Sequence, residues 1–326
     1  MKFVTYFVLV LAVAGRPMPA AAQSPQRIYR VGLLAVGPDP TDQSPFGAGL
    51  IRGFARDGFI LGQNLAFDRR AAHGQVEGLP QLVQELVADK VAVIITQGYP
   101  AAVAAKNHSS LPVVAVQAGD PVADGLAGSF ARPGGHVTGL SEIAAELSAK
   151  RLSLLKTAVP SVHRVAMLWN ADDLGMTLRY KAAEAQARAS GIEVESLGVR
   201  APNDFDAAFA AMVRSPPDAI LMVSDALTTL NRKRVIDFAA EHKLPAIYEY
   251  DYLVRDGGLM SYGPDIAEMF DRAAGLAARI LRGADPGQLP LEEPSRFVLA
   301  INLKTAKKIG LTIPPSLLAR ADLVIE

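Results

Sequence analysis

Side chains able to hold a small molecule recur where short apolar runs of this chain end. They combine hydroxyl, amide and carboxylate groups with tyrosine rings, a set suited to reversible binding. In a parallel sheet, ligands sit outside the carboxyl ends of the strands, so these positions are the candidate ligand contacts. The candidates are Gly98, Tyr99, Gln117, Asp120, Thr138, Ser141, Asn170, Ser224, Asp225, Tyr248 and Tyr250.

Two of these turns have the composition of a carboxylate site. Gly98-Tyr99-Pro100 precedes a predicted helix, whose first backbone N–H groups and dipole attract an anion. Proline suits that first turn because no N–H is needed there. The segment from Thr138 to Ser141 offers the same arrangement. The alternative is that Thr138 and Ser141 only cap helices and form turns.

Two aspartates have the chemistry to accept hydrogen bonds from a ligand ammonium group, since a carboxylate in a closed cleft makes strong charge-assisted bonds. Each also has a structural alternative. Asp120 precedes Pro121 and is typical of a turn, and Asp225 is placed to N-cap a helix near Leu227.

Aromatic residues are few, at 6% of the chain, yet several lie near predicted strand ends. Tyr99, Tyr248 and Tyr250 are predicted to form a stacking wall for a planar or apolar solute. Trp169 is expected in the core, and Glu249 is expected to be a solvated loop charge.

Motifs for catalysis, metals and cofactors do not emerge. The chain has no Gly-x-Ser-x-Gly elbow, no phosphate loop ending in Gly-Lys-Ser/Thr and no His-Glu-x-x-His. Gly47-x-Gly49 is followed by Gly53 one residue too late for a dinucleotide fingerprint, and predicts a helix-packing segment instead. The five histidines are scattered and cysteine is absent, so we expect no metal and no cofactor.

The elements that position the candidates alternate between β-branched apolar runs and helical segments, which predicts parallel sheets built from βαβ units. The fold class is therefore α/β, with two doubly wound parallel-sheet lobes and a hinge. The first set of predicted strands is 31–36, 65–69, 91–96, 113–117 and 136–138. The second is 164–169, 193–197, 219–223 and 246–248, with helices such as 141–158 and 175–190 between them.

The C-terminal part has a different order of elements: a long helix over 264–281, a turn region, a strand near 297–301 and a helix over 303–309 capped by Asn302. We expect it to return first to one lobe and then to the other. The predicted lobes are 27–139 plus about 252–292, and 140–251 plus about 293–326, joined by three crossings.

The N-terminus has the pattern of a secretory signal over residues 1–22. Lys2 supplies positive charge, residues 3–14 an apolar region, and Ala20-Ala21-Ala22 a cleavage site. An uncleaved anchor is the alternative, but a dozen apolar residues fall short of the roughly 20 that span a bilayer. Without cysteine, lipidation at a cysteine is impossible. The formal charge of zero, without a basic patch, argues against nucleic acid as a partner. We therefore expect a periplasmic protein.

Four motifs in order resemble the ABC-transporter substrate-binding family whose better-known members bind tryptophan or tyrosine. They are GDPV at 119–122, ARPGGHVTG at 131–139, GGLMSYG at 257–263 and INLKTAKKIGLTIPPSLLARAD at 301–322. The resemblance runs from about Tyr29 to Glu326. It implies a type I periplasmic binding fold, a cleft that closes on a small solute, and docking onto a membrane permease with its ATPase. The chain differs from the pattern at Tyr99, at His136 and at Tyr248-Glu249-Tyr250.

The expected function is that of a monomeric solute receptor for an ABC importer, with an aromatic or branched amino acid or an aromatic acid as the solute. Helix N-termini suit the acid and tyrosines suit the apolar part. A sensor that hands its closed state to a membrane receptor is one alternative. An exported α/β enzyme using Asp120 or Glu249 is another.

Overall fold

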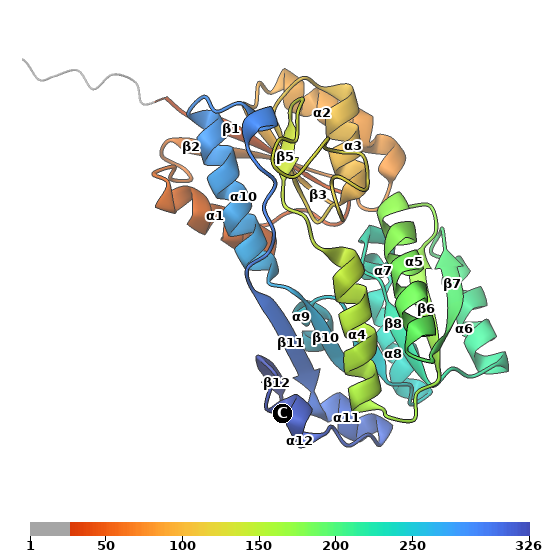
Figure 1. The fold of residues 1–326 in the computed structure, drawn as a ribbon. Helices are drawn as coiled ribbons and strands as arrows, with labels where there is room; N and C mark the ends of the chain where they lie inside the picture. Colours follow the sequence, from red (N-terminus) through yellow and green to blue (C-terminus); the bar gives the residue numbers. More distant parts are fainter. Residues whose placement is uncertain (1–26) are drawn as a thin grey trace, which may run out of the picture.

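The computed structural model describes residues 27–326, so the predicted signal segment, residues 1–22, lies outside the described part. Within that part, no helix has both the length and the hydropathy needed to cross a bilayer. The chain forms two α/β lobes, one above the other in Figure 1, each with its own sheet.

The first lobe contains a five-stranded sheet in the order β2-β1-β3-β4-β5, with every pair parallel. Its strands are β1 (Tyr29–Ala35), β2 (Leu65–Ala71), β3 (Val93–Gln97), β4 (Val113–Val116) and β5 (Val137–Gly139). The three central strands are apolar on both faces because helices cover both sides. On one face lie α2 (Leu79–Ala88) and α3 (Tyr99–His108); on the other lie α1 (Pro45–Arg56) and α10 (Ile266–Leu281).

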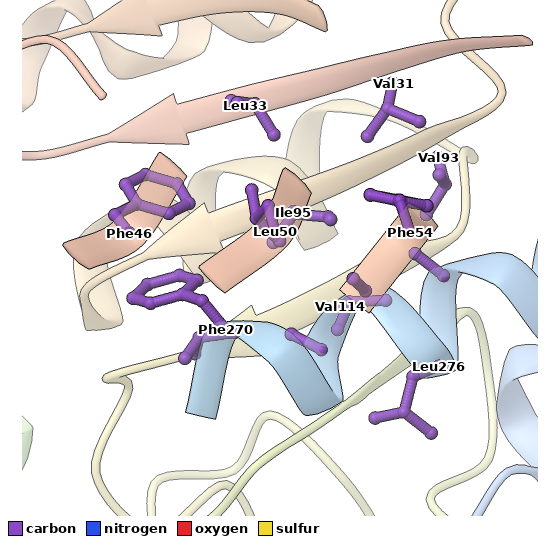
Figure 2. Close-up of a cluster of buried hydrophobic side chains, with 14 of the residues drawn as sticks. Val31, Leu33, Phe46, Leu50, Phe54, Val93, Ile95, Val114, Phe270 and Leu276 are labelled. Atoms are coloured by element: carbon purple, nitrogen blue, oxygen red, sulfur yellow. The ribbon is translucent and has the colours of Figure 1, made fainter. Parts of the chain in front are cut away.

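The helices α1 and α10 are distant in sequence but pack together over this sheet. Figure 2 shows Phe46, Leu50 and Phe54 of α1 and Phe270 and Leu276 of α10 in one apolar cluster with the strands, and the rings of Phe46 and Phe270 lie close together. The predicted helix-packing glycines make this approach possible. A Cβ on Gly49 would lie 2.5 Å from the Ala267 carbonyl oxygen, and one on Gly53 would lie 2.3 Å from that of Asp271. The prediction for this segment is confirmed.

The second lobe contains a seven-stranded sheet in the order β12-β11-β10-β9-β8-β6-β7, in which only the β10–β11 pair is antiparallel. Its strands are β6 (Arg164–Asn170), β7 (Glu193–Val199), β8 (Ala219–Met222), β9 (Ala246–Tyr248), β10 (Met260–Pro264), β11 (Phe297–Asn302) and β12 (Leu323–Ile325). One face packs against α4 (Ala144–Ala158), α5 (Leu174–Ala189), α11 (Leu303–Ile309) and α12 (Pro315–Leu318). The other packs against α6 (Asp204–Arg214), α8 (Arg232–Glu241) and α9 (Asp251–Arg255).

One boundary between the lobes lies later in the sequence than expected. The prediction returned the chain to the first lobe at about residue 252, but β10 pairs with β9 and β11 of the second sheet. The return comes at Asp265, which N-caps α10 by accepting a hydrogen bond from the Glu268 amide. The sequence did not indicate β10 because its five residues include Gly263 and Pro264, which are rare in strand interiors.

Three segments connect the lobes: 140–143 between β5 and α4, the turn at Asp265, and 289–296 before β11. Two of them are hydrogen-bonded to each other. The Ser141 amide donates to the Glu292 carbonyl at 2.9 Å, and the Glu292 amide donates to the Gly139 carbonyl at 3.0 Å. Few backbone torsions therefore separate two well-packed bodies, which is the usual construction of a hinge.

Candidate functional site

A cleft between the lobes consists of two connected spaces. The main chamber has a volume of about 480 Å³ and the hinge-side chamber about 80 Å³. Both are bounded by Gly98 and Gln117 from the first lobe and by Ser224 and Asp225 from the second. Tyr99 and Asn170 also line the main chamber, and Tyr250 lines the hinge-side chamber. Strand ends of both sheets thus bring these predicted site residues together.

The remaining four predicted residues line neither chamber. Asp120 stabilises the turn in which it lies, because its Oδ1 accepts hydrogen bonds from the Val122 and Ala123 amides at 3.0 and 3.3 Å. The buried Thr138 hydroxyl donates to the Leu289 carbonyl at 2.9 Å, and Ser141 Oγ accepts from the Ile143 amide at 3.3 Å. For Asp120, Thr138 and Ser141, the structural alternative therefore describes the geometry.

Tyr248 does not belong to the predicted stacking wall, because its place in the strand directs its side chain into the core. It lies within β9, fully buried in the apolar cluster beneath α6 and α8. Its neighbour Ile247 faces the opposite cluster. Alternation along the strand directs Ile247 and Tyr248 to opposite faces of the sheet, and Tyr248 enters the core. Tyr250 lies beyond the end of β9, and it lines the cleft together with Tyr99. Trp169 packs in the core as predicted, stacked on Tyr180.

The first-lobe wall of the cleft presents a helix N-terminus. Gly98 is the N-cap of α3 with a φ of 93°, and no side chain bonds to the first-turn amides. The Tyr99 and Ala101 amides have no acceptor within the helix, Ala102 donates to the Gly98 carbonyl, and Gly98, Tyr99 and Pro100 place this end of the helix at the cleft. Pro100 occupies the first turn as expected. This wall is suited to an anionic group such as a carboxylate.

The second-lobe wall presents acceptors. Asp225 N-caps the short helix α7 (Ala226–Leu230), accepting from the Thr228 amide at 2.9 Å, and its Oδ2 accepts from Asn170 Nδ2 at 2.5 Å. The capping alternative is therefore correct, and the carboxylate still lies in the cleft. Beside it, the Ser224 hydroxyl is buried without a hydrogen-bond partner among residues 27–326. A buried unpartnered hydroxyl is costly unless something else, such as a ligand, satisfies it.

Next to the cleft, a buried ionic network links four charged residues that the sequence did not single out as a group. Arg179 donates to Glu142 Oε2 at 2.5 Å and to Glu249 Oε2 at 2.9 Å, and Arg151 donates to Glu249 Oε1 at 2.8 Å. All four side chains are at most 4% exposed. The prediction that Glu249 is a solvated loop charge is wrong.

The network spans the hinge. Glu142 lies in the first connecting segment, and its carboxylate also accepts from the Gly119 amide of the first lobe at 3.2 Å and from Tyr250 Oη at 2.5 Å. Burial opposes the charge of Arg179, but the carboxylates of Glu249 and Glu142 hold its pKa above the usual value. Burial and the adjacent Glu142 raise the pKa of Tyr250, so this phenol stays protonated. The signal in the sequence was a glutamate between two tyrosines, which needs a cationic partner if buried.

Two further carboxyl groups meet where the lobes approach each other. Asp124 belongs to the turn after β4, and Asp173 N-caps α5 of the second lobe. A Cβ on Gly175 would lie 3.2 Å from Asp173 Oδ1 and 3.6 Å from Asp124 Oδ2, so both carboxylates crowd one backbone site. Burial raises the pKa of Asp124 to about 7, opposed by Arg179. Burial and Asp225 raise the pKa of Asp173 to about 6.

A family model described as ABC transporter substrate binding protein matches residues 43–325 of this chain. The tyrosine-binding protein of Clostridioides difficile strain R20291 is 26% identical over 265 residues, which is 81% of this chain and 76% of that protein. These relatives are solute-binding proteins rather than enzymes.

Solved structures show the same fold. An ABC domain from Streptococcus pneumoniae in complex with L-Trp superposes with a TM-score of 0.84 at 25% identity, covering 91% of this chain and all of the other. A leucine-binding protein from Thermotoga maritima, 12% identical, superposes with a TM-score of 0.59 and covers 86% of this chain and 87% of the other. The architecture is that of type I periplasmic binding proteins. With the family model matching nearly all of the described residues, this chain belongs to the ABC transporter substrate-binding protein family.

Proposed function

We propose that this protein captures an amino acid with an aromatic side chain in the periplasm and delivers it to an ABC permease and its ATPase. The observation that carries the proposal is the opposition of two different walls in one interlobe cleft. The N-terminus of α3 offers donors for a carboxylate, and Asp225 with Ser224 offers acceptors and a hydroxyl for an ammonium group.

The charges of the cleft favour an amino acid over an aromatic acid that lacks an amino group. Asp173 and Asp225 line the main chamber, while its one arginine, Arg200, is engaged at the rim by Asp172 at 3.1 Å. An anion without a compensating ammonium group would face these carboxylates unpaired. A zwitterion places one charge on each wall.

Binding of this kind acts by population shift rather than by covalent chemistry. A ligand that contacts both lobes stabilises the closed arrangement more than the open one, and the permease distinguishes the two. Tyr250 connects the cleft to the hinge, because its ring lines the hinge-side chamber and its hydroxyl donates to Glu142.

The test is a ligand screen by thermal unfolding and calorimetry on protein that has been unfolded and refolded to remove carried-over solute. We expect at least one of L-tryptophan and L-tyrosine to raise the Tm, since a ligand at 100 times its Kd adds about 2.7 kcal/mol of stability. Ser224→Ala should weaken binding, whereas Ser153→Ala on the exposed side of α4 should not. Binding of a sugar and of no amino acid would overturn the proposal.

Delivery to a permease requires a separate measurement in cells. Deletion of the gene should reduce uptake of the radiolabelled amino acid identified in the screen, and expression of the full chain should restore it. Tight binding with unchanged uptake would instead favour a sensor that reports to a membrane receptor.

A further inference from the structure

The hinge-side chamber contains two amide side chains that come from adjacent strands of the first lobe. Gln97 ends β3 and Gln117 follows β4, and Gln97 Nε2 donates to Gln117 Oε1 at 2.8 Å. This bond uses one polar atom of each amide. Among the described residues, the side-chain oxygen of Gln97 (Oε1) and the side-chain nitrogen of Gln117 (Nε2) have no hydrogen-bond partner. If the nitrogen and oxygen of both amides were exchanged, the pair would still present one donor and one acceptor.

The backbone at Gln117 supports a directed role for this side chain. Its φ is 53°, in the left-handed region that a glutamine rarely adopts. Strained backbone of this kind clusters at ligand sites, where it sets the direction of a side chain. Here it occurs at a residue that borders both chambers of the cleft.

Apart from the Ser224 hydroxyl, which borders both chambers, the polar side chains that share the hinge-side chamber with these amides are already engaged. Tyr250 Oη donates to Glu142, and Tyr252 Oη lies 3.3 Å from Thr229 Oγ1. The two tyrosine rings are stacked, with centroids 5.8 Å apart and planes at 16°. The chamber therefore combines a stacked pair of aromatic rings with a pair of amides that has unused hydrogen-bonding capacity. A volume of about 80 Å³ admits the end of a ring and its substituent, while the amino-acid backbone remains in the main chamber.

We propose that Gln97 and Gln117 determine specificity by hydrogen-bonding a hydroxyl group at the far end of an aromatic amino-acid ligand. This inference rests on the proposed function. A phenol hydroxyl donates to the Gln97 carbonyl and accepts from the Gln117 amino group, so it satisfies both atoms. A phenyl ring satisfies neither and leaves them buried and unpaired, which costs binding free energy. Sites built to bond a ligand hydroxyl strongly reject the analogue that lacks it.

The experiment is calorimetric titration of the mature chain with L-tyrosine and L-phenylalanine. We expect tyrosine to bind at least tenfold more tightly. In Gln97→Met and Gln117→Met, which keep side-chain length, the ratio of the two affinities should fall at least fivefold, mainly through weaker tyrosine binding. Gln81→Met on the exposed face of α2 is the matched control and should leave the ratio unchanged.

Each outcome separates this inference from the proposed function. Equal affinity of the wild-type protein for the two ligands would overturn the inference and leave the amino-acid receptor standing. An unchanged ratio in folded Gln97→Met and Gln117→Met would also overturn it. Binding of neither ligand, nor of any other aromatic amino acid, would refute the receptor proposal itself. The wild-type ratio decides the question even if a variant does not fold.

Discussion

At the scale of single residues, Arg179, which the sequence did not single out, links two buried carboxylates beside the cleft. It pairs with carboxylates from two different segments, Glu142 of the hinge and Glu249 after β9. Replacement by an apolar side chain would leave both carboxylates close together and buried without their shared cation. Breaking a buried pair in this way is far more damaging than losing an exposed one.

We expect Arg179→Met to lower the free energy of unfolding by about 3–5 kcal/mol. Arg200→Met is the matched control, because Arg200 pairs with Asp172 at the surface and exposed pairs contribute about 1 kcal/mol or less. Urea unfolding followed by circular dichroism measures both. Equal effects of the two substitutions would mean that the network contributes little to stability.

Part of the site could be predicted from residue types, and part could not. Gly98, Gln117, Ser224 and Asp225 follow from the rule that ligands sit at the carboxyl ends of parallel strands. The partners of Arg179 depend on how the hinge segment folds back against α5, which no local pattern encodes. Asp124 and Asp173 escaped notice for the same reason, since their environment exists only when the two lobes approach each other.

At the scale of elements, the contact between α1 and α10 returns the C-terminal part of the chain to the first lobe. Gly53 allows the two helices to approach until backbone meets backbone, and Arg56 of α1 adds an ion pair to Asp271 of α10 at 2.6 Å. A methyl group on Gly53 would have to push backbone aside rather than a mobile side chain.

Gly53→Ala should therefore destabilise the protein by about 1–3 kcal/mol despite the better helix propensity of alanine. Gly275→Ala in α10 is the opposite case, because its Cβ would come no closer than 3.9 Å to any neighbour outside its own helix. That substitution should raise stability by about 0.5–1 kcal/mol. Thermal unfolding of the two variants compares them directly, and a stabilised Gly53→Ala would contradict the packing argument.

The elements themselves were largely predictable, since the strands of both sheets that carry the cleft are β-branched runs closed by turn residues. The exceptions are β10, which contains Gly263 and Pro264, and β12, which has three residues; both pair with β11. Their strand conformation depends on pairing rather than on local propensity.

At the scale of the whole molecule, the two lobes carry one each of the crowded carboxyl groups, Asp124 and Asp173. Their pKa values of about 7 and about 6 belong to the arrangement in which the lobes meet. Opening the hinge would expose both groups to water, where a carboxyl titrates near 4. Between these limits the closed form holds more protons than the open form, so closure is favoured as the pH falls below about 7 and opposed as it rises above.

Because of Asp124 and Asp173, binding of the solute is expected to take up protons. The observed enthalpy of binding should then depend on the buffer that supplies those protons. At pH 6.5, the observed enthalpy of ligand binding should change linearly with the ionisation enthalpy of the buffer, with a slope of about 0.5–1 proton taken up per ligand. Replacing both residues by asparagine should bring the slope close to zero, whereas Glu146→Gln on the exposed face of α4 should leave it intact. A flat response in the wild-type protein would mean that the two groups keep the same protonation when the lobes part. A positive slope would mean that a receptor facing an acidic medium holds its solute more tightly than one facing a neutral medium, without any change in the residues that touch the ligand.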